Sequence, residues 1–493
     1  MIVALIVILS VICTSLVCYC KIKHKYWQER DVPFVQPTLL FGSLLTFIFD
    51  NDNLRTYLKN TFKIFHGPYY GFFVFTKPFL VIQDLEIIRN ITITNFSNFP
   101  NKLFLGDEKC DQIFGRSIFT KRDDEWRSLR LKLSGIFTNS KLKNMVNFIQ
   151  RSGENLERYL ETILDKDVEV TNVVSKYSLS LISSSIFGID IDYFDTEVSN
   201  FQYYSQRTVS KGVIGVIKNI SYVFVHPLVK TFKYSFLDPT GVKYLAKVFL
   251  DVLKNREVGN KRNDFIDVLL SLKNSKEENK QRALSYDMMV AQAILFFTAG
   301  HETTTATITF TLHELSLNPT IQNRARQEIN VVLKRHNGNI NYNSLHDMKY
   351  LDMIIRETLR KYPIISFLHR ETRAPYVIPQ TGLKLDCGTA IIVPIQSVHY
   401  NPKYYPNPNN YDPERFNDEN IKKGILDTFL PFGIGPRHCL GEKFAYISMK
   451  AGLLYILRRF QVESNSKTRK LINIKTSYIS SAKGGVHLSF KKL

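Results

Sequence analysis

The stretch Phe429–Phe444 reads FLPFGIGPRHCLGEKF and decides how the chain folds around it. Three glycines surround a single cysteine, Cys439, and Arg437 lies two residues before it. Glycines let a backbone approach a flat ligand closely, and N–H groups in such a loop can donate to a thiolate. An apolar helical pattern resumes after Gly441, which places the sulfur near a helix N-terminus, where negative charge is favoured. The loop therefore predicts a thiolate that ligates the metal of a planar ligand; the alternative is a buried inert thiol.

The overall composition is typical of a basic globular protein. The chain has 493 residues, 44% hydrophobic and 22% charged, with 65 Lys+Arg against 45 Asp+Glu. A surplus of positive charge suggests an acidic partner, an anionic membrane surface or nucleic acid. No basic run interleaved with aromatics and no zinc-finger or helix-turn-helix signature is present, so we expect no nucleic-acid partner. The six cysteines show no zinc spacing and no disulfide framework, which indicates a reducing compartment.

The N-terminus predicts a membrane anchor. Residues 1–20 contain no charged residue and are followed by Lys21, Lys23 and Lys25. An apolar run of about 20 residues is just long enough to cross a bilayer, and the flanking positive charges are expected to stay in the cytosol. A cleaved signal peptide is the competing interpretation, but it normally carries its basic residues before the apolar part. We expect a single-pass protein whose body faces the cytosol.

The rest of the chain predicts one large domain that is mainly α with small β-sheets (α+β). Residues 21–43 are expected to form a basic, Pro- and Gly-marked hinge, and 44–493 the catalytic domain. Residues 68–84 predict a β-hairpin with Lys77-Pro78 as its turn, and the charged stretch 273–282 predicts a solvated loop. Apolar spacing predicts helices near 141–165, 240–256, 285–317, 319–335 and 347–361, and strand-like pieces lie at 372–395 and 470–490.

A second motif, AGHETT, covers Ala299 to Thr304 within an otherwise apolar helical segment. Glu302 is an isolated acid there, which is costly unless it is used. The Thr303 hydroxyl can bond to the carbonyl four residues earlier and, with Gly300, open a notch in the helix. A hydroxyl backed by a carboxylate can deliver protons to bound oxygen. The alternative is a polar helix face turned to solvent.

These motifs together resemble one family. FGIGPRHCLG (432–441) resembles the heme-binding signature of the cytochromes P-450, and AGHETT, ETLR (357–360) and PERF (413–416) match in the expected order. The resemblance runs from YWQERDVPF to SAKGGVHLSF and is strongest to the insect microsomal branch that handles xenobiotics and endogenous lipophiles. It implies that a single, mainly helical heme-binding domain of the cytochrome P-450 type follows the transmembrane helix, with heme b held by Cys439. The hinge departs from the family's proline-rich form.

The resemblance also implies supporting residues. Glu357 and Arg360 lie three apart and share a helix face; with Arg415 they resemble a buried scaffold network, whereas an exposed pair is the alternative. Trp126 and Arg130 lie one helical turn apart. The implied heme contacts are Trp126, Arg130, Arg370, Phe432, Gly433 and Arg437, with Cys439 as the axial ligand of the iron.

The implied activity is a membrane-bound monooxygenase that inserts one oxygen atom of O2 into lipophilic xenobiotics, hormones or lipids, with Glu302 and Thr303 as catalytic residues. The chain shows no flavin or nicotinamide fingerprint, so electrons are expected from an NADPH-dependent cytochrome P-450 reductase, with cytochrome b5 as a second candidate donor. The implied location is the endoplasmic reticulum membrane, with the catalytic domain facing the cytosol. The basic residues expected to dock the acidic reductase are Lys132, Lys422, Lys423 and Lys443.

The substrate is weakly determined by the sequence. By analogy the pocket is expected to be lined by Phe119, Phe296, Phe297, Ala299, Ile364, Leu368 and Ile479, each of which could equally be core. The apolar segment 213–228 is interpreted either as a membrane-dipping entrance or as a buried helix. Two other functions stay open: a reductase-independent heme-thiolate isomerase or dehydratase, and a non-catalytic heme-binding membrane protein.

Overall fold

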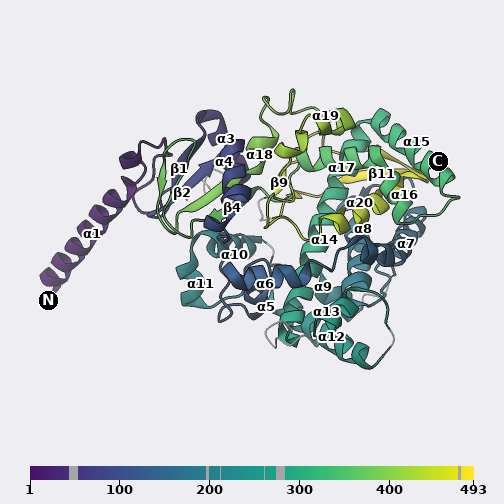
Figure 1. Ribbon diagram of the computed structural model, residues 1–493, viewed down its shortest axis with the longest axis horizontal. Helices are drawn as coiled ribbons and strands as arrows, with labels where there is room; N and C mark the ends of the chain where they lie inside the picture. Colours follow the sequence, from purple (N-terminus) through teal and green to yellow (C-terminus); the bar gives the residue numbers. More distant parts are fainter. Residues whose placement is uncertain (44–53, 196–198, 211, 260, 274–283, 476–478) are drawn as a thin grey trace.

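The computed structural model describes residues 1–43, 54–195, 199–210, 212–259, 261–273, 284–475 and 479–493, and it is mainly helical with small β-sheets, as predicted (Figure 1). The helices are α1 (Ile2–His24), α3 (Leu54–Ile64), α4 (Leu85–Arg89), α5 (Gln112–Arg116), α6 (Asp123–Leu133), α7 (Asn139–Glu161), α8 (Val170–Ile182), α9 (Asn200–Ser205), α10 (Gly212–Phe224), α11 (His226–Phe232), α12 (Pro239–Val258), α13 (Phe265–Lys273), α14 (Tyr286–Leu317), α15 (Pro319–Arg335), α16 (Tyr342–Asp347), α17 (Lys349–Lys361), α18 (Ile395–His399), α19 (Asp418–Lys422) and α20 (Glu442–Leu457). The strands are β1 (Tyr69–Val74), β2 (Lys77–Ile82), β3 (Val168–Glu169), β4 (Phe367–Glu371), β5 (Tyr376–Val377), β6 (Lys384–Leu385), β7 (Ala390–Pro394), β8 (Phe460–Ser464), β9 (Ile474–Lys475), β10 (Ser481–Ala482) and β11 (His487–Lys492).

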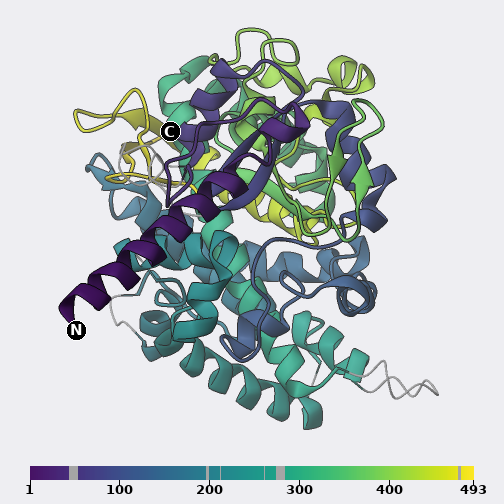
Figure 2. The ribbon, with the colours of Figure 1, turned by 90° about the vertical axis from the view of Figure 1, so that its left-hand side faces the viewer.

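Helix α1 stands apart from the body of the protein (Figures 1 and 2). The candidate span lies within Ile2–Arg30; its most apolar 18-residue window has a mean hydropathy of 2.7 and no residue buried inside the protein. A helix with this exposure and length is suited to cross a membrane, as the sequence predicts.

The segment after α1 is packed against the sheet, although the sequence predicts a hinge there. Trp27 is fully buried, and a Cβ on Gly71 of β1 would lie 2.4 Å from its ring. The Gly71 N–H donates to the Pro33 carbonyl at 2.7 Å, and the Val35 N–H donates to the Gly71 carbonyl at 2.9 Å. The link between anchor and domain is therefore tied to β1.

The predicted hairpin exists, but its turn lies elsewhere. Strands β1 and β2 are antiparallel with Tyr69 opposite Ile82 and Val74 opposite Lys77, so the turn is Phe75-Thr76 and not Lys77-Pro78. Phe75 takes the left-handed conformation that the tight turn needs, with φ 53°. Pro lacks an N–H and is tolerated only near the start or edge of a strand, which is where Pro78 lies.

Four small sheets occur in the described part of the chain. The largest has the order β1-β2-β7-β4 with β2 and β7 parallel, and another has the order β3-β11-β8. The five predicted helical segments correspond to α7, α12, α14, α15 and the α16–α17 pair. Long α14 packs against α8, α17 and α20, and so forms the centre of the helical body (Figure 1).

Segment 213–228 forms α10 and the start of α11, which bend by 115° relative to each other. Residues 274–282 of the predicted charged loop lie outside the described residues.

Candidate heme-thiolate site

The cysteine loop has the tight geometry that its glycines predict. The Cys439 N–H donates to the Phe432 carbonyl at 2.8 Å and closes the loop. Gly433 and Gly435 have φ of 72° and 74°, a conformation that favours glycine. A Cβ on Gly435 would lie 1.9 Å from the Thr92 carbonyl oxygen, so this position also has no room for a side chain.

The Cys439 sulfur lies three residues before α20 begins at Glu442. Burial raises the pKa of the thiol, and a hydrogen bond from the Gly441 N–H opposes that rise. The side chain nevertheless keeps accessible surface, as expected for a sulfur at the bottom of a recess. A cationic ligand atom such as a metal would favour the thiolate form here.

A cluster of cations lies near this cysteine. Lys102, Arg370 and Arg437 are close together: the charge of Arg370 lowers the pKa of both other residues, and that of Arg437 lowers the pKa of Lys102. Burial and then the charge of Arg370 lower the pKa of Arg437 to about 8, and burial followed by Arg437 and Arg370 lowers that of Lys102 well below its ordinary value. Like charges held together in the interior are unfavourable unless an anion joins them. The cluster therefore fits a ligand that carries carboxylates, such as heme with its two propionates.

Trp126 and Arg130 project from α6 toward the same region. The Arg437 guanidinium stacks on the Trp126 ring at 3.9 Å, and Arg437 also donates to the Pro100 and Lys121 carbonyls at 2.8 Å each. Arg130 donates to the His438 carbonyl at 3.0 Å, and burial lowers its pKa. These contacts fix Arg130 and Arg437 beside the cysteine loop.

Lys102 is a site residue that the sequence analysis missed. Its ammonium lies 3.7 Å from the centre of the Phe119 ring, next to the buried arginines. No motif surrounds it, so only the fold brings Lys102 to this cluster.

The AGHETT motif lies in the middle of α14. The Thr303 hydroxyl donates to the Ala299 carbonyl at 2.7 Å, the bond that the sequence suggests. The helix continues through this point, and Gly300 serves another purpose: a Cβ there would lie 2.7 Å from Ile182 of α8. Glu302 keeps 37% of its side chain exposed, with the His301 ring 3.9 Å away.

A cavity of about 270 Å³ borders this part of α14. Glu302 and Thr303 both line it, together with three of the predicted pocket residues, Phe119, Ala299 and Ile479. Further apolar lining comes from Phe104, Phe114, Val216, Phe236, Leu295, Ala306, Phe310 and Ile365. Glu302, Thr303 and a largely apolar wall that includes five phenylalanines thus border one cavity.

The other four predicted pocket residues are absent from the described lining. Phe297 is fully buried and packs on Phe187 with ring centres 5.0 Å apart, and Phe296 packs between Phe137 and Phe265. The rings of both residues therefore pack against other aromatic side chains of the core. Ile364 is buried in the core, and Leu368 lies against the cysteine loop, 3.6 Å from a Cβ built on Gly433.

The cavity also has polar lining that the sequence analysis missed. Thr298, Thr305 and Thr309 on α14 are among its lining residues, and the buried hydroxyl of each has no hydrogen-bond partner among the described residues. All three residues are more than nine-tenths buried. Buried polar groups normally find partners, so these hydroxyls are suited to contact water or a polar group of a ligand.

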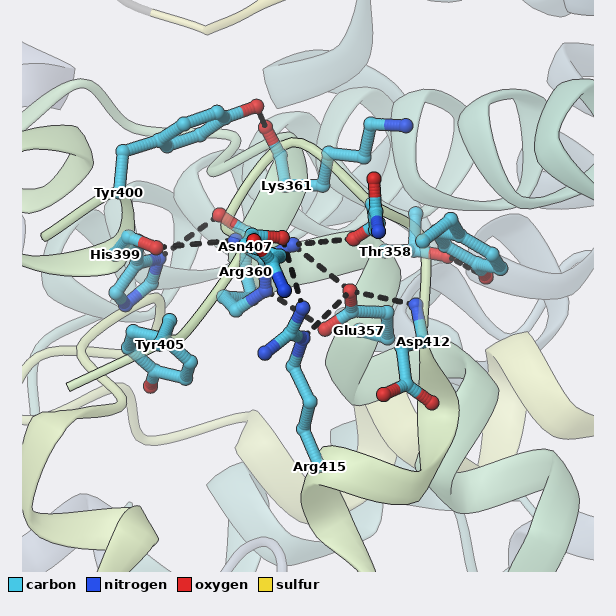
Figure 3. Close-up of polar contacts among 12 residues, drawn as sticks. Glu357, Thr358, Arg360, Lys361, His399, Tyr400, Tyr405, Asn407, Asp412 and Arg415 are labelled. Atoms are coloured by element: carbon cyan, nitrogen blue, oxygen red, sulfur yellow. Dashed lines mark hydrogen bonds and ion pairs between the residues drawn. The ribbon is translucent and has the colours of Figure 1, made fainter. Parts of the chain in front are cut away.

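The predicted Glu-Arg-Arg residues lie together, as Figure 3 shows. Glu357 and Arg360 on α17 are both fully buried, with Arg360 Nε and Nη2 2.7 and 2.8 Å from the two carboxylate oxygens. The Asp412 N–H donates to the same carboxylate at 2.9 Å, and Arg415 Nε lies 3.5 Å from it. Burial alone would lower the pKa of Arg360, but the Glu357 carboxylate raises it above its ordinary value.

His399 joins this network to the cysteine loop. Arg360 Nη1 donates to the His399 carbonyl at 3.0 Å, and His399 Nδ1 donates to the Arg360 carbonyl at 3.1 Å. His399 Nε2 accepts from the Leu430 N–H at 3.0 Å, just before the loop. A ring nitrogen that accepts from a backbone N–H carries no proton, so His399 is neutral here.

Comparison with known proteins agrees with this geometry. A family model described as Cytochrome P450 matches residues 32–490. Cytochrome P450 6k1 of Blattella germanica is 32% identical over 99% of this chain and 97% of its own length. Cytochrome P450 6j1 of the same organism is 33% identical over 95% of this chain and 93% of its own length. Probable cytochrome P450 6a13 of Drosophila melanogaster is 33% identical over 99% of both chains.

Proposed function

Because this chain belongs to the cytochrome P450 family, in its insect branch, and is therefore a heme monooxygenase, we propose that it oxidises small lipophilic substrates at a membrane with electrons from a separate NADPH-dependent reductase. The observation that carries the proposal is the shared cavity of Glu302 and Thr303, an acid and a hydroxyl facing an aromatic wall. We further propose that the cofactor is heme b and the co-substrate O2.

The residues near Cys439 would hold the heme. The thiolate of Cys439 would ligate the iron, while Lys102, Arg130, Arg370 and Arg437 would neutralise the propionates. When bound, a thiolate-ligated heme activates dioxygen for insertion into a C–H bond. The Glu357 network acts through His399, which holds the start of the cysteine loop by the Leu430 N–H. We assign that network to positioning.

We propose that residues of α14 would supply the protons that the reaction consumes. The Thr303 side chain borders the cavity while its hydroxyl donates to the Ala299 carbonyl, so the hydroxyl oxygen can still accept a hydrogen bond from a water or a ligand and hold it in place. Glu302 is partly exposed and borders the same cavity, so it can exchange protons with solvent and supply them to water beside Thr303.

The electron donor is proposed to dock beside the cysteine loop. Lys443 lies in the first turn of α20 and donates to Asn139, and Lys423 pairs with Glu419 at 2.5 Å. Lys422 is exposed on α19, and Lys132 lies near the end of α6. Positive groups around the thiolate face would steer an acidic reductase, with cytochrome b5 as a second candidate partner.

The membrane is proposed to contact more than α1. Helices α10 and α11 lie on the same side of the molecule as α1 (Figure 1). Val213, Ile214 and Ile217 of α10 are 75%, 63% and 50% exposed, and Phe232 of α11 is 69% exposed. Apolar side chains so exposed are suited to a lipid surface. Val216 and Gly215 of α10 line the cavity, so lipid-dissolved substrates would enter there. We propose the endoplasmic reticulum, with the catalytic domain facing the cytosol.

The lining predicts a substrate that is apolar with a few polar groups. The wall is largely apolar and includes five phenylalanines, while Thr298, Thr305 and Thr309 on α14 carry hydroxyls without a partner among the described residues. A hydroxylated or keto-bearing lipophile would satisfy these hydroxyls better than a pure hydrocarbon.

The test is reconstitution of the full chain with reductase in phospholipid vesicles, followed by product analysis under labelled dioxygen. The proposal predicts NADPH-dependent product that carries one labelled oxygen. Product formed from a hydroperoxide without NADPH would instead support the isomerase or dehydratase. NADPH consumption that no lipophile stimulates would support the non-catalytic heme protein.

A further inference from the structure

A second pocket, separate in its lining from the substrate cavity, lies between two loops near the C-terminus. It has a volume of about 240 Å³, below the range of about 300–1,000 Å³ typical of sites for drug-sized ligands. The described residues that line it are His313, Lys467, Thr468, Arg469, Ile472, Asn473, Lys483, Gly484, Gly485, Val486 and His487. Its size and its basic lining suit a small anion.

His313 of α14 is the buried member of this lining, at 1% exposure. Its Nε2 lies 2.7 Å from the Arg469 carbonyl, which can only accept, so Nε2 carries the proton. The other ring nitrogen, Nδ1, then has a free lone pair, and it has no hydrogen-bond partner among the described residues. A buried acceptor left without a donor is costly, so Nδ1 requires a ligand or water that donates.

The charge around His313 is arranged to keep that lone pair. Burial is the main cause of the lowered pKa of His313, and the charge of Lys361 lowers that pKa further. The Arg469 carbonyl and Glu314 raise the pKa, but not enough to offset burial. The pocket's other charged groups are Lys467, Arg469, Lys483 and His487. His313 therefore stays neutral and accepts a hydrogen bond.

Two cations at the rim have no ion-pair partner in the part of the chain that the structure describes. These are Arg469 and Lys483, both exposed. The other two basic residues already hold a carboxylate: Lys467 lies 2.6 Å and His487 3.0 Å from Asp167. The lining of the pocket thus combines two exposed cations without an ion-pair partner among the described residues and one buried histidine with an unpartnered nitrogen.

We propose that this pocket binds a hydrogen phosphate group, whose anionic oxygens accept from Arg469 and Lys483 and whose remaining P–OH donates to His313 Nδ1. Sulfate has the same shape and charge but no proton near neutral pH, so it would leave Nδ1 unsatisfied. The same chemistry could come from free inorganic phosphate or from a small phosphate monoester. Lys483 directly follows Ala482, which lines the substrate cavity, so the anion would lie beside one wall of that cavity.

The experiment is isothermal titration of the full-length, heme-loaded protein in detergent at pH 7 and fixed ionic strength. Inorganic phosphate, glycerol 3-phosphate and sulfate are titrated in parallel. We expect phosphate to bind at least about tenfold more tightly than sulfate, because an unmet buried polar group costs about that much. A monoester is largely deprotonated at this pH, so tighter binding of inorganic phosphate assigns the site to it. Equal or tighter binding of glycerol 3-phosphate, which has largely lost its P–OH at this pH, would contradict the proposed bond to His313 Nδ1.

Variants identify the site. Arg469→Gln and Lys483→Gln, at exposed positions where folding is retained, should each weaken phosphate binding at least about tenfold. Lys491→Gln, a loss of the same charge at an exposed lysine outside the pocket, should leave binding unchanged. His313→Gln keeps an N–H donor for the Arg469 carbonyl but has no acceptor at the position of Nδ1, so the affinity for phosphate should fall to that for sulfate. The proposal is overturned if phosphate and sulfate bind equally to the unaltered protein, if Lys491→Gln weakens binding as much, or if phosphate gives no binding heat.

Discussion

Replacement of Glu357 by Gln tests whether the buried charge of Arg360 is stabilised by the Glu357 carboxylate. The carboxylate accepts from Arg360 twice, at 2.7 and 2.8 Å, and from the Asp412 N–H at 2.9 Å, all out of contact with water. Gln keeps the shape but turns an NH2 group toward N–H donors and leaves the Arg360 charge unpaired. Loss of one partner of a buried pair costs about 3–5 kcal/mol, and we expect a decrease of that size in the free energy of unfolding.

The assay is denaturant unfolding of the full chain, followed by circular dichroism of the helices. Glu419→Gln is the matched control, because Glu419 pairs with Lys423 at the surface with both side chains largely exposed. It should leave the free energy of unfolding unchanged within error.

A double-mutant cycle isolates the pair itself. Glu357→Met and Arg360→Met each leave a charge buried, whereas the double variant removes both charges. The double variant should therefore be more stable than the sum of the single effects predicts, by about 2 kcal/mol. Additive effects, or a Glu357→Gln variant as stable as the unaltered protein, would refute the account of a mutually dependent pair.

Three other changes test the loop, the relay and the cation cluster. Gly435→Ala should lower the free energy of unfolding by about 2–5 kcal/mol, because an alanine there has a disfavoured φ and a steric clash. Gly338→Ala, at a similar φ but in open space, should lower it by only about 1–2 kcal/mol in the same assay. Thr303→Val should keep substrate binding but lower the product formed per NADPH consumed. The control is Thr307→Val, whose hydroxyl donates to the Thr303 carbonyl and which should leave this ratio unchanged. The same ratio of product to NADPH in both variants would contradict the relay. Lys102→Met should speed the transfer of heme to an acceptor protein, and an unchanged rate would remove Lys102 from the propionate site.

The sequence predicts those parts of the site that depend on local backbone geometry. The spacing of Gly433 and Gly435 indicates a tight loop, and both glycines take positive φ. The bond from Thr303 to the Ala299 carbonyl also follows from helical spacing alone. Such features need no knowledge of the rest of the chain.

Tertiary partners explain what the sequence analysis missed. Gly300 is expected to open a notch but instead makes room for Ile182, which lies over a hundred residues earlier and is invisible to a local pattern. Lys102 joins the arginines only because the fold brings its loop to them. Helical spacing separates Phe297 from the face of Ala299 but not Phe296, which lies three residues from Ala299, so only the tertiary packing of Phe296 shows where its ring lies.

The absorption of the reduced, carbon monoxide-bound protein tests the central claim, that Cys439 ligates heme iron, most directly. The account predicts a thiolate-type band for the unaltered chain and for Cys387→Ala, a control at another exposed cysteine, and loss of that band in Cys439→Ala. A thiolate-type band that survives in Cys439→Ala would contradict it.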